Sequence, residues 1–141
     1  YWQKDVEDNA YALMKTEDGK VAMLHSSATS WRHRFSLDIT LSKGALTLAG
    51  ILSGSKSYGD ETLKIIYASN DESKDPKEKI LHYEDDPSWA EEVIEFADAL
   101  VNGAKIINGT KEDAYKTMEL VYRIYCADKE WKKNWELTWK P

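Results

Sequence analysis

The sequence predicts an α+β domain in which a predominantly antiparallel β-sheet of about six strands is followed by two C-terminal helices packed on one face. Up to Glu84 the chain consists of short segments in which apolar and polar residues alternate, and this period of two is typical of strands. Turn sequences such as Asp18-Gly19 separate these segments and indicate hairpins. After Pro87 the apolar residues recur at helical spacing, and strands followed by helices favour a layered α+β domain.

Four strands are predicted in the stretch from Asp8 to Ile51. We expect a type I′ turn at Asp18-Gly19, because both central positions of that turn need a positive φ. Ser42 to Gly44 joins the last two strands of the stretch. In order, the four strands are residues 10–15, 21–32, 34–42 and 45–49.

Two further strands are expected at Glu61–Ala68 and Ile80–Glu84, separated by a charged surface loop. The segment 53–60, rich in glycine and serine, precedes the first of them. Its glycines do not have the G-x-G-x-x-G spacing that cradles a pyrophosphate, so we interpret it as a flexible connection.

The first helix is predicted to begin at the capping box Ser88 to Glu91 and to stop at Asn102-Gly103. The second is predicted to begin near Thr110, with acidic residues in its first turn. Beyond it the tail carries Trp131, Trp135 and Trp139. Three tryptophans so close in sequence should either pack back on the domain or contact a partner.

Length and composition predict one soluble domain spanning residues 1–141. A net charge of −6 argues against a nucleic-acid partner, and no apolar run approaches the roughly 20 residues that span a membrane. The single cysteine, Cys126, excludes an internal disulfide and disfavours a cysteine-based metal site, which fits a cytoplasmic protein. Because the chain begins at Tyr1 rather than Met, we expect it to be a piece of a longer protein.

No self-sufficient active site can be read from the sequence, and no metal site is predicted. The three histidines lack metalloprotease spacing, and neither a nucleophile elbow nor a P-loop is present. His25 lies mid-strand, where a structural role is favoured over a catalytic one. Arg32 and His33, at a strand junction, are better candidates for contacting an anionic or hydroxylated ligand. We therefore name His25, Arg32 and His33 as substrate-side candidates and assign no catalytic residue.

The order of elements and several phrases resemble the C-terminal domain of the glucose–fructose oxidoreductase / inositol dehydrogenase (Gfo/Idh/MocA) family. The similar segments cover most of the chain: EDNAYALMKTEDGKVAMLHSSATSW at 7–31, FSLDITLSKGALTLAG at 35–50, residues 59–63, and the helices at 89–102 and 113–125. The resemblance implies a sheet that finishes a substrate site and pairs subunits through its open face. It also implies NAD or NADP on an N-terminal Rossmann domain, with hydride transfer to or from a sugar, polyol or related compound.

The departures from the family pattern locate the chemistry outside this chain. The glycine-rich dinucleotide motif is absent, and so is the Glu-Lys-Pro motif that supplies the catalytic lysine; Glu78-Lys79-Ile80 lacks the proline. No catalytic or cofactor residue can be carried over. The chain is therefore expected to be the substrate-site and oligomerisation part of an NAD(P)-dependent oxidoreductase, inactive alone, with its Rossmann domain missing.

Two alternatives belong to other classes of protein. The chain could be a free-standing, non-catalytic binding or dimerisation module. It could also be an independent small enzyme that uses His25 or His33, which we rank last. We also expect a homodimer through the open sheet face. The reason is that the second face of the first, second and fourth strands is small and weakly polar.

Overall fold

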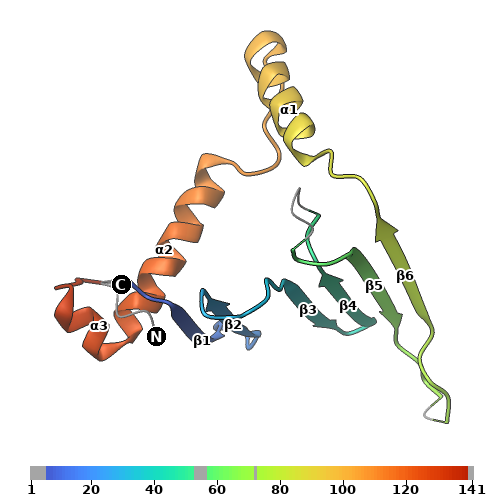
Figure 1. Cartoon of the computed structure of the whole chain (residues 1–141), viewed down its shortest axis with the longest axis horizontal. Coiled ribbons are helices and arrows are strands. Elements are labelled where there is room, and N and C mark those ends of the chain that lie inside the picture. The colour runs from blue at the N-terminus through green and yellow to red at the C-terminus, as the bar shows by residue number, and fades with distance from the viewer. Residues whose placement is uncertain (1–5, 53–56, 72, 140–141) are drawn as a thin grey trace. The chain divides into compact units, whose positions relative to one another are not determined.

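The computed structural model describes residues 6–52, 57–71 and 73–139 of the chain, and Figure 1 gives the order of its elements. The segment 53–56 of the expected glycine- and serine-rich connection lies outside the described residues. The chain forms two compact units. We call residues 27–90 the sheet unit, and residues 6–26 with 91–139 the hairpin–helix unit.

The predicted fold class is confirmed: the described residues form antiparallel strands and helices, with more strands than helices. The strands form two sheets, however, and not one. The strands β1 (Asn9–Lys15) and β2 (Val21–Ser27) pair with each other. The other sheet is a meander in the order β3-β4-β5-β6, with bounds Ser36–Leu41, Gly44–Ala49, Glu61–Tyr67 and Glu78–Tyr83.

The register of the meander gathers its large apolar side chains on one face. Leu37, Leu48, Leu63 and Leu81 are aligned across all four strands, and alternate residues of a strand point to the same face. We call this surface the leucine face. Its apolar members are Leu37, Ile39, Leu41, Leu46, Leu48, Leu63, Ile65, Tyr67, Leu81 and Tyr83.

The opposite surface, which we call the polar face, is held by side-chain contacts between strands. Asp38 accepts hydrogen bonds from Thr47 at 2.7 Å and from Ser36 at 3.0 Å. Lys64 of β5 pairs with Glu78 of β6 at 3.3 Å. Most large apolar side chains lie on the leucine face, although Ile66 and Ile80 lie on the polar face and Glu61 and Lys79 on the leucine face. The meander thus approaches the two-sided pattern of an antiparallel sheet with one solvated face.

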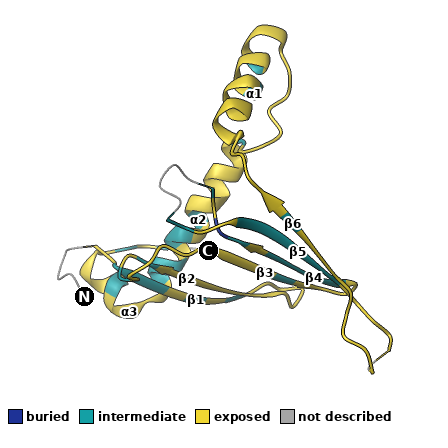
Figure 2. Cartoon of the chain, turned by 45° about the vertical axis from the view of Figure 1, so that its right-hand side comes forward, coloured by how far each residue is buried: buried dark blue, intermediate teal, exposed yellow. Residues whose placement is uncertain are grey.

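The core of the sheet unit is thin. Figure 2 shows β4 and β5 as half-buried, while most of β3 and β6 is exposed. Among the described residues only Gly50 is buried, and no apolar side chain is. The leucine face is therefore accessible along much of its area.

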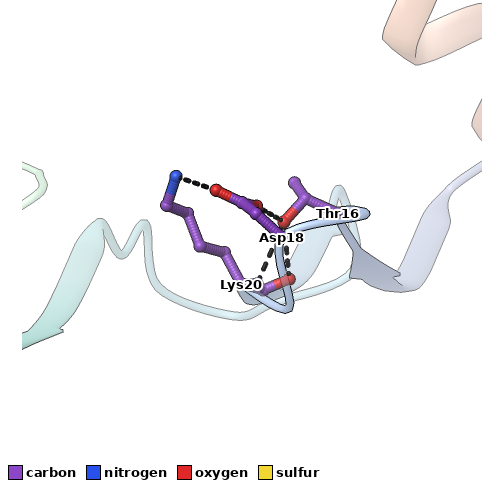
Figure 3. A network of polar contacts seen from close by, with 3 residues as sticks. All are labelled: Thr16, Asp18 and Lys20. Carbon is purple, nitrogen blue, oxygen red and sulfur yellow. Dashed lines mark hydrogen bonds and ion pairs between the residues drawn. The ribbon is translucent and has the colours of Figure 1, made fainter.

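The β1–β2 turn differs from the expected type I′ turn. Thr16 and Lys20 close a three-residue loop, in which the N–H of Thr16 donates to the carbonyl of Lys20 at 2.9 Å. Only Gly19 has a positive φ, +88°, as in a type I turn followed by a left-handed residue. Figure 3 shows why the loop closes this way: the Asp18 carboxylate accepts from the Thr16 hydroxyl and binds the Lys20 ammonium.

The strand β2 ends at Ser27, so the prediction that it runs to Arg32 is wrong. The hydroxyl of Ser27 accepts a hydrogen bond from the N–H of Thr29 at 3.1 Å. Serine side chains that bond nearby backbone in this way form turns that compete with strand pairing. Residues 28–35 therefore form a connection to β3.

The helix α1 spans Ser88–Asn102, and its predicted stop is confirmed because Gly103 has a φ of +67°. The predicted capping box at its start is wrong. Ser88 is already the first residue of the helix and not its N-cap, and it donates from its N–H and its hydroxyl to Asp86, at 3.1 and 2.6 Å. Asp86, two residues earlier, supplies the acceptor because its carboxylate reaches the first free N–H of the helix.

The helix α2 spans Lys111–Ala127 and begins with a capping box between Thr110 and Asp113, as its predicted start requires. The short helix α3, Lys129–Asn134, follows in the tail. The tail packs back on α2, which confirms the first of the two alternatives for the tryptophans. Tyr122 bonds Thr138 in both directions, and the Arg123 guanidinium lies 4.7 Å from the ring centre of Trp139.

Candidate functional site

A hollow of about 290 Å³ lies in the sheet unit where β3 and β5 begin and β4 and β6 end. This volume is at the lower end of the range for small-molecule pockets, about 300 to 1,000 Å³. The hollow is a property of the sheet unit alone. Its lining includes Phe35, Leu48, Glu61, Leu63, Tyr83 and Asp86.

Gly50 shapes the hollow by letting two strands approach closely. It has a φ of +73°, and a Cβ there would lie 2.1 Å from the carbonyl oxygen of Asp60. Its N–H donates to the carbonyl of Phe35 at 3.2 Å. Only glycine combines this backbone conformation with this contact, so the wall of the hollow depends on one residue.

Glu61 is held at the start of β5. One oxygen of its carboxylate, Oε2, accepts a hydrogen bond from the N–H of Leu52 at 2.9 Å. Glu61 is the register partner of Tyr83 on β6, so both side chains belong to the leucine face at its end. The bond from Leu52 thus fixes a carboxylate beside an aromatic ring.

Asp86 provides a second carboxylate in the connection between β6 and α1. The hydroxyl and N–H of Ser88 both donate to its Oδ1, and these bonds lower the pKa of Asp86 below its usual value. Hydrogen bonds to the charged form favour that form. Asp86 is therefore anionic at neutral pH.

The hollow combines an apolar floor with two carboxylates at its border. Phe35, Leu48 and Leu63 supply apolar surface, and Glu61 and Asp86 supply the charge. None of the described lining residues is histidine, cysteine or lysine, and the one serine among them, Ser88, donates its hydroxyl to Asp86. Such a site can bind a ligand and orient it.

Two of the predicted substrate-side residues, Arg32 and His33, lie in the sheet unit, in the exposed connection before β3. His33 Nδ1 is hydrogen-bonded to the Ser57 hydroxyl at 3.1 Å, and its ring lies 4.9 Å from that of Tyr58. Neither Arg32 nor His33 lines the hollow. His33 instead ties two connections together.

The third predicted residue, His25, belongs to the hairpin–helix unit. Its ring stacks on Tyr11 of the neighbouring strand, with centres 4.3 Å apart and planes at 10°. The structure thus gives His25 a cross-strand packing contact, the role that the sequence favours. Arg32 and His33 belong to the other unit.

A second hollow, of about 400 Å³, lies in the hairpin–helix unit beside α1. Its carboxylate, Glu95, accepts hydrogen bonds from the N–H of Ile107 at 2.7 Å and from that of Asn108 at 3.1 Å, and these lower its pKa. Glu95 thus anchors the connection between α1 and α2. This role is structural.

Within the described ranges, no three side chains of histidine, cysteine, aspartate or glutamate form a group that could hold a metal ion. No helix in the described part of the chain has the length and apolar character to cross a membrane.

The hollow's carboxylates were not among the residues that the sequence singles out. Glu61 and Asp86 stand 25 positions apart and match no motif. Their positions near strand ends could have identified them. In an antiparallel meander, the start of β5 and the end of β6 lie at the same end of the sheet. Strand bounds accurate to one residue would have been needed to apply it.

Comparison with known proteins gives no relative: no family, no curated protein and no solved structure matches the chain.

Proposed function

We propose that this chain is the substrate-site and oligomerisation part of an NAD(P)-dependent oxidoreductase acting on a sugar, polyol or related compound, and that it is not catalytically complete alone. The proposal rests on the resemblance of its segments to the C-terminal domains of the Gfo/Idh/MocA family. The antiparallel sheet and the α+β class are compatible with it. In the parent enzyme, NAD or NADP would bind outside this chain.

The observation that carries the association part of the proposal is the open leucine face. Leu37, Leu41 and Tyr67 retain 45%, 55% and 48% of their accessible surface. Removing apolar surface from water stabilises an assembly by about 25 cal/mol per Å². A face that is apolar across four strands therefore favours pairing with a second copy.

We assign the pairing surface to the leucine face and not to the small-residue face expected from the sequence. In the meander that second face carries Asp38, Lys64 and Glu78 beside its alanines. Burying these charged groups on association would need new partners for each of them. On the leucine face, the row Leu37, Leu48, Leu63 and Leu81 carries no charge, and the neighbouring central row has a single charged member, Lys79 of the edge strand β6.

A matched pair of variants tests the proposal. Leu37→Lys places a charge on the leucine face, and Thr40→Lys places the same charge on the polar face of the same strand. We expect sedimentation to show a dimer for the wild type and for Thr40→Lys at high micromolar concentration. Leu37→Lys should weaken the dimer at least about tenfold, because a buried unpaired charge is unfavourable. A wild-type monomer at that concentration would contradict the pairing.

The second candidate, a free-standing binding or dimerisation module, uses the same open face. The oxidoreductase part and the free-standing module differ in what the gene encodes ahead of this chain. A reading frame that encodes a βαβ unit with G-x-G-x-x-G ahead of this chain supports the oxidoreductase, and one that opens just before Tyr1 supports the module.

A further inference from the structure

We propose that the hollow at the end of the sheet unit binds a small organic cation, namely a primary ammonium group carried on an apolar or aromatic body. This inference rests on the hollow's own chemistry and not on the resemblance to an oxidoreductase family. The hollow shares Leu48, Leu63 and Tyr83 with the leucine face proposed for pairing, so a ligand and a second copy would compete for these residues. The inference assigns a ligand class to residues that no motif identifies.

The charge of the lining supports a cation. Glu61 and Asp86 are both acidic, and none of the described lining residues is basic. Arg34, the arginine next to Phe35 in sequence, acts electrostatically on Asp38, which lies on the polar face. The described residues thus give the two carboxylates of the hollow no arginine or lysine partner of their own. An ammonium group would supply the missing positive charge, and hydrogen bonds of this kind are roughly twice as strong as neutral ones.

The apolar floor supports a ligand with a hydrophobic body. Phe35 and Leu48 each remain 36% exposed, and both line the hollow together with Leu63. A bare metal ion or ammonium would leave this surface in contact with water. An alkyl or aryl group would cover it, and removing apolar surface from water favours binding.

Tyr83 links the two parts of the site. It is 44% exposed, lines the hollow and is the register partner of Glu61. The face of an aromatic ring attracts a cation, and this attraction strengthens when the cation is partly removed from water. A ring beside a fixed carboxylate is therefore suited to an ammonium group and much less to a carboxylate or a phosphate.

Glu61 is prepared for this role because its position is fixed before a ligand arrives. The bond from the Leu52 N–H occupies Oε2 and holds the side chain at the border of the hollow. A ligand then orders fewer groups on binding, which is the usual source of affinity in a preorganised site.

The test is a titration of the whole chain followed by amide resonances in NMR spectra. The probe is phenethylammonium chloride, and 2-phenylethanol and 3-phenylpropionate are its neutral and anionic counterparts. We expect saturable shifts from phenethylammonium at the amides of Leu52, Glu61 and Tyr83. Equal binding of the alcohol would overturn the proposal, because the hollow would then select only apolar bulk. The absence of shifts at these amides would overturn it as well.

Two variants with the same change in net charge separate a local effect from a general one. Glu61→Gln keeps an acceptor for the Leu52 N–H and removes the charge at the hollow. Asp38→Asn removes a charge from the polar face of the same sheet. Glu61→Gln should weaken phenethylammonium binding about tenfold or more, while Asp38→Asn should leave it within about twofold. Equal weakening in both variants would contradict a specific site, provided that both spectra retain the wild-type dispersion.

Discussion

At the scale of single residues, the sheet unit depends on a glycine that no motif identifies. Gly50 lies directly after β4. The carbonyl oxygen of Asp60 is only 2.1 Å from the position that a Cβ of residue 50 would occupy. Among the described residues, Gly50 is also the only one that is buried. A nearby glycine, Gly59, has a similar φ of +83°, but nothing lies within 4 Å of the position of its Cβ.

These two glycines separate steric contact from backbone strain. Gly59→Ala should destabilise the chain by only about 1–2 kcal/mol, the usual strain of a left-handed conformation. Gly50→Ala adds a backbone clash, so its effect should be clearly larger, above about 3 kcal/mol. Urea unfolding followed by circular dichroism measures both. Similar destabilisation in the two variants would show that the close approach of Gly50 to the Asp60 carbonyl does not affect the free energy of unfolding.

At the scale of elements, the helix α2 is set by its N-terminal capping box. The Thr110 hydroxyl accepts from the N–H of Asp113 at 3.2 Å, and the N–H of Thr110 donates back to the Asp113 carboxylate at 3.2 Å. The hydroxyl of Thr110 also donates to that carboxylate at 2.7 Å. These hydrogen bonds from Thr110 lower the pKa of Asp113 below its usual value of 3.8.

The lowered pKa fixes the sign of a pH effect. Because the folded pKa of Asp113 lies below the unfolded value, its contribution to stability is present above about pH 4 and is lost as the pH falls through the folded pKa. Asp113→Asn should therefore lower the urea midpoint at neutral pH and have little effect at about pH 2.

Glu112→Gln is the control for the capping interaction. Glu112 lies in the same first turn but outside the capping box. Its replacement removes an interaction with the helix dipole and an exposed ion pair with Lys111 at 3.6 Å, neither of which involves Thr110. We expect a smaller change of the urea midpoint in this variant. A difference between Asp113→Asn and wild type that is the same at both pH values would contradict the assigned role of the carboxylate.

At the scale of the whole molecule, many large apolar side chains of the described residues are exposed, and none of the described apolar side chains is buried. The leucine face is open in the sheet unit. In the hairpin–helix unit, Leu13, Met23 and Leu100 are 79%, 85% and 70% exposed. Large exposed apolar surfaces mark interaction sites in soluble proteins. The proposed pairing of two copies would cover part of this surface.

If the chain is part of a larger oxidoreductase, the cofactor should bind outside it. Because the chain lacks the glycine-rich dinucleotide motif, we expect the 141-residue chain to leave NADH fluorescence unchanged up to high micromolar concentration. Joining it to the Rossmann domain of the proposed parent enzyme should give binding. Tight NADH or NADPH binding by the chain alone would contradict the proposal that the nucleotide site lies outside it.

Local features of this protein follow from the sequence alone. Alternation placed β3, β4 and β5 within two residues of their bounds, and Gly103 and Thr110 marked helix ends as expected. These features depend on neighbours within a few residues, where periodicity and capping act directly. The type of turn at Gly19 and the end of β2 at Ser27 were missed, because local side-chain hydrogen bonds overrode the pattern.

Only the tertiary structure decided which residues meet. The division into two sheets, the alignment of four leucines and the hollow that contains Glu61, Tyr83 and Asp86 all depend on strand register. A shift of one residue moves every side chain to the other face, and sequence patterns do not resolve bounds that finely. The candidate site could not be predicted from the sequence for this physical reason. Its residues meet at one end of the sheet, but they have no regular spacing along the chain.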